Sequence, residues 1–407
     1  MKRIYLVFQL FLTLLVIPVV AFCSCVSQEG TVSTLVPAEY NAWLEIDTLQ
    51  FGKNIDYLRT VVGRSTKICV VMKGDAYGNG IRTLIPVVKS RGVECVAITS
   101  NDEARSVRNG GYEGRVVRIR LASEGEVEDA LELGVEELVG SLTQAKAMSK
   151  IATLHGKTIK CHLAINAGGM SRNGMELKTG VAEAVAVTKL DGLKCVGMMT
   201  HYPTSNDGEI VRQLTEFKAQ VSRVIKEAGL NREDLLLHTA ATYAALYLPQ
   251  TRLDMVRIGS ALYNYGYTEK FSEFKKLMSF KSRVASVQEY PEGNTVNYKR
   301  TYKLKRRSRL ANIPIGYANG FSKTMANKGF VLIRGHRCPV VGCVTMNITM
   351  VDVTDWPDIQ SGDEVTIYGR QGKDEITSRE IGEWGGLDFL SQAMFWSATN
   401  PKVAVGK

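Results

Sequence analysis

The chain has 407 residues, of which 45% are hydrophobic and 23% charged, with a formal net charge of +10. This composition excludes a disordered or fibrous protein, and the length allows one large domain with a smaller one. The most basic run, residues 303–309, has no interleaved aromatic residues, so we do not expect nucleic-acid binding despite the positive charge.

The first 24 residues predict a signal peptide. Two basic residues precede an apolar run over residues 4–22, and small and polar residues follow it. A membrane anchor is one alternative, because the run approaches the roughly 20 residues that a spanning helix needs. A lipid anchor on a leader cysteine is another. Pro18 near the end of the run favours cleavage, so we expect export to the periplasm, with residues 25–41 as a short N-terminal segment.

Residues 42–270 repeat one pattern, in which short β-branched runs alternate with longer segments of helical period. The eight runs cover residues 67–73, 94–100, 114–122, 136–142, 159–166, 193–202, 235–240 and 254–259. This alternation predicts an α/β fold with a (β/α)8 barrel, and a doubly wound open sheet is the weaker alternative. Polar residues and one glycine stand at the ends of these runs: Lys73, Arg120, Asn166, His201, Thr239 and Gly259. In a barrel, strand ends meet at one mouth.

Residues 271–407 have a different pattern of short alternating strands separated by Gly, Pro and Asn turns. A helical segment returns only near residues 377–396. We therefore expect a mostly β C-terminal domain that covers the mouth of the barrel or mediates dimerisation.

Lys73 ends an apolar run in the stretch VMKGDAYGNG, residues 71–80. Such a lysine is either a solvated strand end or a nucleophile toward a carbonyl group, because partial burial lowers the pKa of its ammonium group.

Six cysteines follow the leader, and they lack the close paired spacing of a zinc site, so we expect no metal. Cys69 and Cys95 lie on consecutive predicted strands. Export would permit a disulfide between them, but the sequence does not decide the pairing.

The segment KGDAYGNG, residues 73–80, resembles the cofactor-lysine motif of the alanine racemase family, whose members use pyridoxal phosphate. Further segments resemble this family in the same order along the chain: GGMSRNG (168–174), MTHYP (199–203), DMVRIGSALY (254–263), TVNYKRTY (295–302), IPIGYANG (313–320) and VGCVTMNITMVDV (341–353). The leader, the segment 164–174 and the Cys69/Cys95 pair are most similar to the periplasmic broad-specificity amino-acid racemases, which implies a disulfide between these cysteines.

The resemblance implies a role for each matching residue. Lys73 would hold the cofactor and act as one acid–base group, and Tyr298 of a second subunit would act on the opposite face of the substrate Cα. The other implied cofactor-binding residues are Tyr77, Arg172, His201, Thr242, Arg257, Gly259 and Ser260. Arg172 and the backbone of Met346 would bind the substrate carboxylate. Each of three roles has a purely structural alternative. Tyr298 could pack at a dimer interface, His201 could be a buried structural histidine, and residues 259–260 could form a surface turn.

The sequence departs from the family at several positions. Asn297 and Lys299 flank Tyr298 where Ser or Gly is common, and Ala393 stands where a late phosphate-binding tyrosine is expected. Further departures are Asn319 and Asn347 for an aspartate, Cys343 for a basic residue and Ala164 for a lysine that is often carbamylated.

These observations predict a homodimeric racemase that interconverts L and D forms of free amino acids, such as lysine, arginine or alanine, with pyridoxal phosphate. The alternative is a catalytically weakened protein of the same fold that binds cofactor or amino acid. A decarboxylase of this fold type lacks support, because its catalytic cysteine region is not recognisable.

Overall fold

The structure is a computed structural model that describes residues 39–169, 174–265 and 270–406. The predicted leader and most of the segment 25–41 lie outside the described residues. Within the described ranges, no helix is long and apolar enough to cross a membrane.

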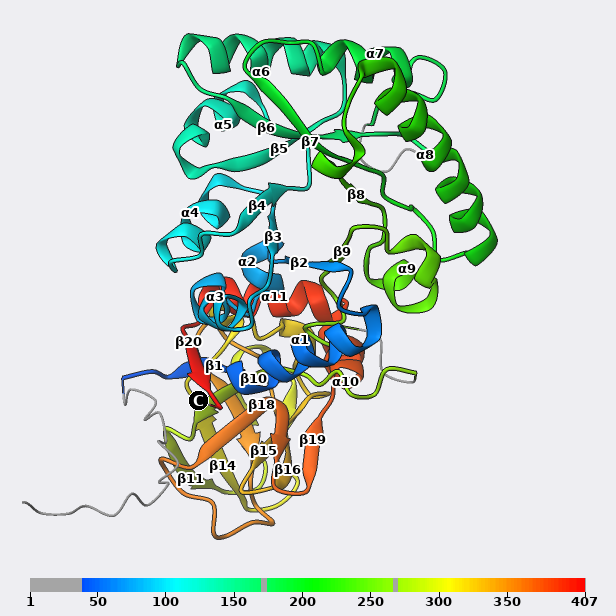
Figure 1. Cartoon of the computed structure of the whole chain (residues 1–407). Coiled ribbons are helices and arrows are strands. Elements are labelled where there is room, and N and C mark those ends of the chain that lie inside the picture. Colours follow the sequence, from blue (N-terminus) through cyan, green and yellow to red (C-terminus); the bar gives the residue numbers. More distant parts are fainter. Residues whose placement is uncertain (1–38, 170–173, 266–269, 407) are drawn as a thin grey trace, which may run out of the picture. The chain divides into compact units, whose positions relative to one another are not determined.

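The first part of the chain is built on one sheet of eight parallel strands (Figure 1). These strands are β2 (Lys67–Val71), β3 (Cys95–Ile98), β4 (Arg115–Arg118), β5 (Val135–Val139), β6 (Ile159–Ala164), β7 (Leu193–Met199), β8 (Leu236–His238) and β9 (Met255–Ile258). All eight predicted strands are therefore confirmed.

The sheet curves until its two outer strands, β8 and β9, meet. Between them the Asp254 N–H donates to the Leu237 carbonyl at 3.1 Å, and the Arg257 N–H donates to the Ala240 carbonyl at 3.0 Å. The sheet is consequently a nearly closed barrel, as predicted, rather than an open doubly wound sheet.

Helices connect the strands and cover the barrel. They are α1 (Thr48–Val62), α3 (Ile81–Ser90), α4 (Asn101–Asn109), α5 (Glu124–Asp129), α6 (Leu142–Leu154), α7 (Gly180–Val187), α8 (Asp207–Ala228) and α9 (Thr242–Tyr247). Helix α8 buries Ile210, Leu214 and Phe217, whose spacing of three to four residues places them on one face. Capping boxes begin α4, with Ser100 and Glu103, and α5, with Ser123 and Glu126.

Side chains along each barrel strand alternate between the interior and the helix layer. Met255 packs in the same interior cluster as Cys69 and Cys95. Two and four residues further along, Arg257 and Gly259 follow on the same face and reach the carboxyl end of the barrel. The alternation thus carries polar side chains into the interior.

The second part of the chain is mostly β, as predicted. Its main sheet has the order β16-β15-β18-β10-β1-β20, with β19 on β18, and it is accompanied by the sheet β11-β14-β17 and the hairpin β12-β13. The strands are β1 (Ala42–Asp47), β10 (Met278–Arg283), β11 (Ser286–Tyr290), β12 (Thr295–Val296), β13 (Tyr302–Lys303), β14 (Ser308–Ile313), β15 (Phe330–Ile333), β16 (His336–Pro339), β17 (Thr349–Asp352), β18 (Glu364–Gln371), β19 (Asp374–Ile376) and β20 (Lys402–Val405).

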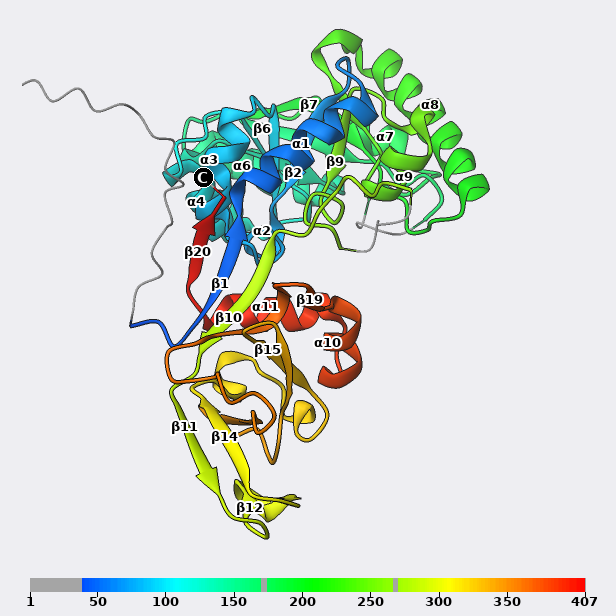
Figure 2. The same cartoon turned by 90° about the horizontal axis from the view of Figure 1, so that it is seen from below.

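Strand β1 connects the two parts of the fold. It lies between β10 and β20, pairing antiparallel with the first and parallel with the second (Figure 2). Residues 42–44 are almost fully buried, so this strand needs partners on both edges. The predicted barrel segment, residues 42–270, thus begins with a strand that belongs to the C-terminal sheet. The domain bounds stay a prediction.

The helical segment expected near residues 377–396 is confirmed as two helices, α10 (Ser378–Gly385) and α11 (Phe389–Thr399). Gly386 separates them because it adopts the left-handed conformation with φ of 72° that ends α10.

Candidate active site

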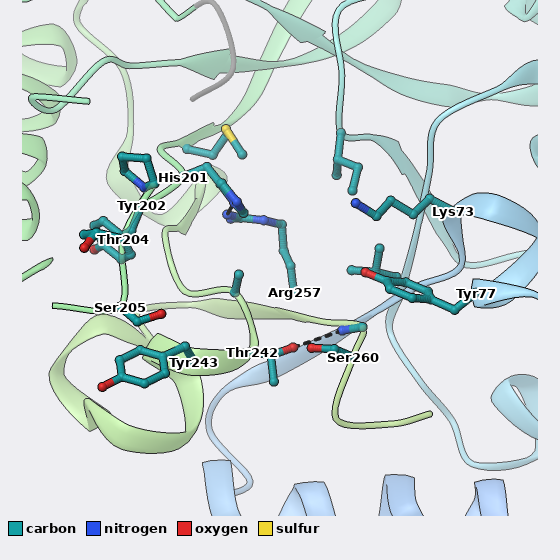
Figure 3. Close-up of a pocket in the computed structure, with 16 residues that line it drawn as sticks. Lys73, Tyr77, His201, Tyr202, Thr204, Ser205, Thr242, Tyr243, Arg257 and Ser260 are labelled. Carbon is teal, nitrogen blue, oxygen red and sulfur yellow. Dashed lines mark hydrogen bonds between the residues drawn. The ribbon is translucent and has the colours of Figure 1, made fainter. Parts of the chain in front are cut away.

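A cavity of about 390 Å³ opens at the carboxyl ends of the barrel strands. Figure 3 shows Lys73 and Tyr77 on one side of it and His201, Thr204 and Ser205 on the other. Seven of the residues that the sequence singles out line this cavity: Lys73, Tyr77, His201, Thr242, Arg257, Gly259 and Ser260. Residues separated by nearly 190 positions in the sequence thus share one space.

Lys73 stands where β2 gives way to the turn α2 (Lys73–Tyr77). This turn is left-handed, with φ between 50° and 57° at Asp75, Ala76 and Tyr77. Non-glycine residues rarely adopt this conformation, which costs roughly 1–2 kcal/mol per residue. Backbone bonds hold the turn, including Ala76 N–H to the Met72 carbonyl at 2.7 Å. Strain stored beside Lys73 is typical of a functional site, where the surrounding structure fixes one geometry.

The Lys73 ammonium lies over the Tyr77 ring, with Nζ 5.7 Å from the ring centroid. This distance permits a cation–π contact. The left-handed turn therefore places an amino group and a phenol at the same edge of the cavity.

Gly259 lines the cavity next to the Tyr77 ring. A Cβ at this position would lie 2.4 Å from the Tyr77 hydroxyl, so no larger residue fits without moving that ring. The Gly259 N–H donates to the Thr242 hydroxyl at 3.3 Å. Hydroxyl groups and a backbone amide therefore gather around a small cradle, and such groups suit a phosphate.

Arg257 is only 3% exposed, and its guanidinium is held by many acceptors. Nη1 donates to Nδ1 of His238 at 2.7 Å and to the His238 carbonyl at 2.8 Å. Nη2 donates to the carbonyls of Thr200 and Thr239, each at 3.0 Å, and lies 3.4 Å from Nδ1 of His201. These bonds fix the guanidinium at the floor of the cavity.

Some cavity residues are missed by the sequence interpretation. Tyr202, Thr204, Ser205 and Tyr243 also line the space. Burial raises the pKa of Tyr202 to about 12, so its phenol stays neutral. His238, which orients Arg257, is missed as well. The alternation of side chains along each strand could have identified it. His238 lies two residues after the interior residue Leu236, as Arg257 lies two residues after the interior residue Met255.

Other predicted residues lie elsewhere. Tyr298 is 76% exposed and Met346 is 55% exposed on the C-terminal part of the chain, and neither lines the cavity. Asn297 links their two loops, because its amide donates to the Cys343 carbonyl at 2.9 Å. Arg172 falls outside the described residues. Ala393 is fully buried in α11 and does not line the cavity, and its correspondence to a phosphate-binding tyrosine stays a prediction.

Three of the six predicted strand-end residues do not join the cavity. Arg120 forms an ion pair with Glu126, the Asn166 side chain accepts from the N–H groups of a local turn, and the Thr239 hydroxyl donates to the Thr251 carbonyl. Their polar groups stabilise loops at the mouth.

Cys69 and Cys95 are register partners on the adjacent strands β2 and β3, and both are fully buried. Their sulfur atoms lie 2.9 Å apart as thiols. The disulfide stays a prediction. Among the described residues, no group of three or more His, Cys, Asp or Glu side chains could hold a metal.

Comparisons with known proteins agree with this architecture. Residues 46–266 match the family of the alanine racemase N-terminal domain, and residues 277–392 match that of the C-terminal domain. A broad specificity amino-acid racemase of Pseudomonas putida is 45% identical over 381 residues, which is 93% of each chain. A lysine racemase of Proteus mirabilis is 42% identical over 90% of each chain. The solved alanine racemase of Clostridium difficile has a TM-score of 0.82 at 26% identity, covering 90% of this chain and 96% of its own.

Proposed function

Because the chain belongs to the alanine racemase family, we propose that it is a pyridoxal-phosphate-dependent racemase of free amino acids with relaxed side-chain specificity. The observation that carries the proposal is the cavity that brings Lys73, Arg257 and the Gly259 cradle together. The relatives named as broad specificity and lysine racemases support the substrate class. No finding favours the alternative of a catalytically weakened binding protein.

The residues of the cavity fit the cofactor. Its phosphate suits the cradle formed by hydroxyls and the Gly259 backbone, and the absence of a Cβ at Gly259 lets the Tyr77 hydroxyl approach that backbone closely. Thr242 and Ser260 add hydroxyls, and Lys73 provides the amino group that would bind the cofactor aldehyde. When bound, pyridoxal phosphate supplies an electron sink for the negative charge that develops at the substrate Cα.

Arg257 would face the pyridine nitrogen of the cofactor. A guanidinium does not release its proton at physiological pH, so the ring nitrogen would accept a hydrogen bond without becoming protonated. His201, 3.4 Å from the guanidinium, would lie beside it. This arrangement limits how far charge spreads into the ring and thereby disfavours side reactions such as transamination.

Racemisation needs acid–base groups on both faces of the Cα, since the proton leaves one face and returns on the other. Lys73 would serve one face. Tyr298 is exposed and lies outside the cavity of its own subunit, so it would serve the cavity of a second copy. Apolar side chains exposed on the same part of the chain, including Tyr317, Ile348 and Phe395, support a homodimer with shared sites. Arg172 and the Met346 backbone would bind the substrate carboxylate.

We extend the proposal to location. The leader sequence supports export to the periplasm, where a racemase would release D-amino acids outside the cytoplasm.

The test is exchange of the substrate α-proton in deuterium oxide with L-lysine, L-arginine and L-alanine. The wild type should incorporate deuterium and form the D enantiomer. Lys73→Ala should remove the visible absorbance of lysine-bound cofactor. Tyr298→Phe should keep that absorbance and slow both directions by about 10²–10⁴-fold, the usual contribution of one acid–base group.

Tyr290→Phe is the matched control, because the Tyr290 hydroxyl bonds to Gln288 in an exposed strand of the same part of the chain. It should leave the rate unchanged. If cofactor binds but none of the three amino acids exchanges its α-proton, the racemase proposal fails. Equal rates for Tyr298→Phe and the wild type would remove Tyr298 from the mechanism.

A further inference from the structure

A line of polar side chains runs through the barrel interior, away from the cavity. From Arg257 it passes to His238 at 2.7 Å, from His238 Nε2 to His162 Nδ1 at 2.9 Å, and from His162 Nε2 to Glu136 Oε2 at 2.9 Å. Both histidines are fully buried and Glu136 is 3% exposed. Buried polar groups are costly unless each is hydrogen-bonded, so this line is a built feature of the barrel.

The donors and acceptors of the line allow one direction only. An arginine side chain only donates, so Nδ1 of His238 carries no proton and its neutral ring holds the proton on Nε2. That N–H donates to Nδ1 of His162, which therefore has its own proton on Nε2. This second N–H donates to the Glu136 carboxylate. Both histidines are thus neutral and both hold the Nε2–H tautomer.

Charges at the two ends keep this direction. At the far end, the Glu136 carboxylate accepts from His162 and pairs with a positive charge on the neighbouring strand. Arg115 of β4 donates to the same carboxylate at 3.1 Å. Burial and the charge of Arg257 lower the pKa of His238. The line therefore runs from a cation at the cavity to an anion at the other end.

The neighbouring strand makes room for the line. Gly197 of β7 lies beside His162, and a Cβ there would approach Nδ1 of that ring to 2.3 Å. The pairing of β6 and β7 also shifts between Cys161 and His162. The two imidazole rings meet edge to face, with centroids 4.9 Å apart. A glycine and a register shift thus accommodate a histidine in a closely packed interior.

We propose that His162 and Glu136 are positioning residues: they fix His238 in the tautomer that accepts from Arg257 and so aim the guanidinium at the cavity. With the opposite tautomer, an N–H of His238 would face the N–H groups of Arg257, and the guanidinium would turn away. Neither His162 nor Glu136 lines the cavity. The part of this proposal that concerns cofactor binding rests on the proposed function, and the tautomer part does not.

The direct test is ¹⁵N NMR of the full chain labelled in its five histidines, first without cofactor. His162 and His238 should each show a neutral ring with the proton on Nε2. The groups that face them are Arg257, Arg115, Glu136 and each other. A protonated ring or an Nδ1–H tautomer at either residue in the wild type would overturn the proposal, whatever the variants do.

Three variants then test the link to Arg257. His162→Phe should change the His238 tautomer and weaken pyridoxal phosphate binding, measured by titration, by roughly 10- to 100-fold, the effect of one lost bond to a charged group. His162→Gln retains an acceptor and a donor and should restore part of this affinity. Glu136→Gln keeps the shape and removes the charge, so the His162 N–H resonance should shift.

His155→Phe is the control, because His155 pairs with Glu128 at the surface. It should leave the affinity unchanged. Unchanged cofactor affinity in both His162→Phe and Glu136→Gln would overturn the positioning role. If the tautomers are as stated but no amino acid is racemised, the proposed function fails while the positioning of Arg257 stands.

Discussion

Replacing Gly197 with alanine tests the packing of the barrel interior in a way that does not depend on cofactor or substrate. The new Cβ would lie 2.3 Å from His162 Nδ1 and 2.6 Å from the Leu236 carbonyl oxygen. Real Cβ atoms do not approach other atoms so closely. The carbonyl belongs to the neighbouring strand β8, so it cannot move without disturbing the sheet, and His162 would have to give up its bond to His238.

The expected cost follows from these two clashes. Overpacking of a filled interior costs about 1–3 kcal/mol. A buried donor left without its acceptor, here the Nε2–H of His238, costs about 1–3 kcal/mol more. We therefore expect Gly197→Ala to lower the free energy of unfolding by about 2–6 kcal/mol. Gly125→Ala is the matched control: it lies in α5 with no atom near its would-be Cβ and should stabilise by about 0.5–1 kcal/mol.

The assay is urea unfolding of cofactor-free protein followed by circular dichroism, at one fixed protein concentration because an oligomer depends on it. The midpoint should fall for Gly197→Ala and rise slightly for Gly125→Ala, with similar slopes. A Gly197→Ala midpoint equal to that of the wild type would refute the packing argument, and with it the claim that Gly197 makes room for His162.

Two further outcomes can be measured on the same protein. Peptide mapping of exported protein should recover Cys69 and Cys95 in one cross-linked peptide, whereas Cys161 and Cys195, also register partners, should remain thiols because the Cys195 thiol instead donates to the Gly197 carbonyl at 3.6 Å. Recovery of Cys69 as a free thiol would exclude the disulfide. The Arg120 bond and the Ser123 N–H lower the pKa of Glu126 to about 2, so its stabilising effect is present above about pH 4.5 and lost as the pH falls toward 2. Acidification from pH 5.5 to 3 should therefore destabilise the wild type more than Glu126→Gln, with Glu124→Gln as control; equal losses in the wild type and Glu126→Gln would contradict this.

The sequence predicts the parts of the site that one strand or one turn determines. Lys73 and Gly259 stand at strand ends within recognisable motifs, and the barrel brings such ends to one mouth. His238, His162 and Glu136 lie on three different strands with no shared motif, and their contact depends on strand register and on the side chain absent at Gly197. A pattern within one strand cannot show that relation.

The loop that carries Tyr298 has a strained backbone. In the proposed dimer, this loop would complete the active site of the second subunit. Asn297, Lys299 and Arg300 all have positive φ, between 49° and 61°, a backbone conformation that favours glycine over other residues. Each such residue costs roughly 1 kcal/mol or more, so the surroundings must compensate. One compensation is visible within the subunit, the bond from the Asn297 amide to the Cys343 carbonyl. Within the described part of the chain, the Tyr298 side chain is 76% exposed. In the proposed dimer, the cavity of the partner would enclose that ring and stabilise the strained loop, so the same contact would complete the acid–base pair and offset the backbone strain.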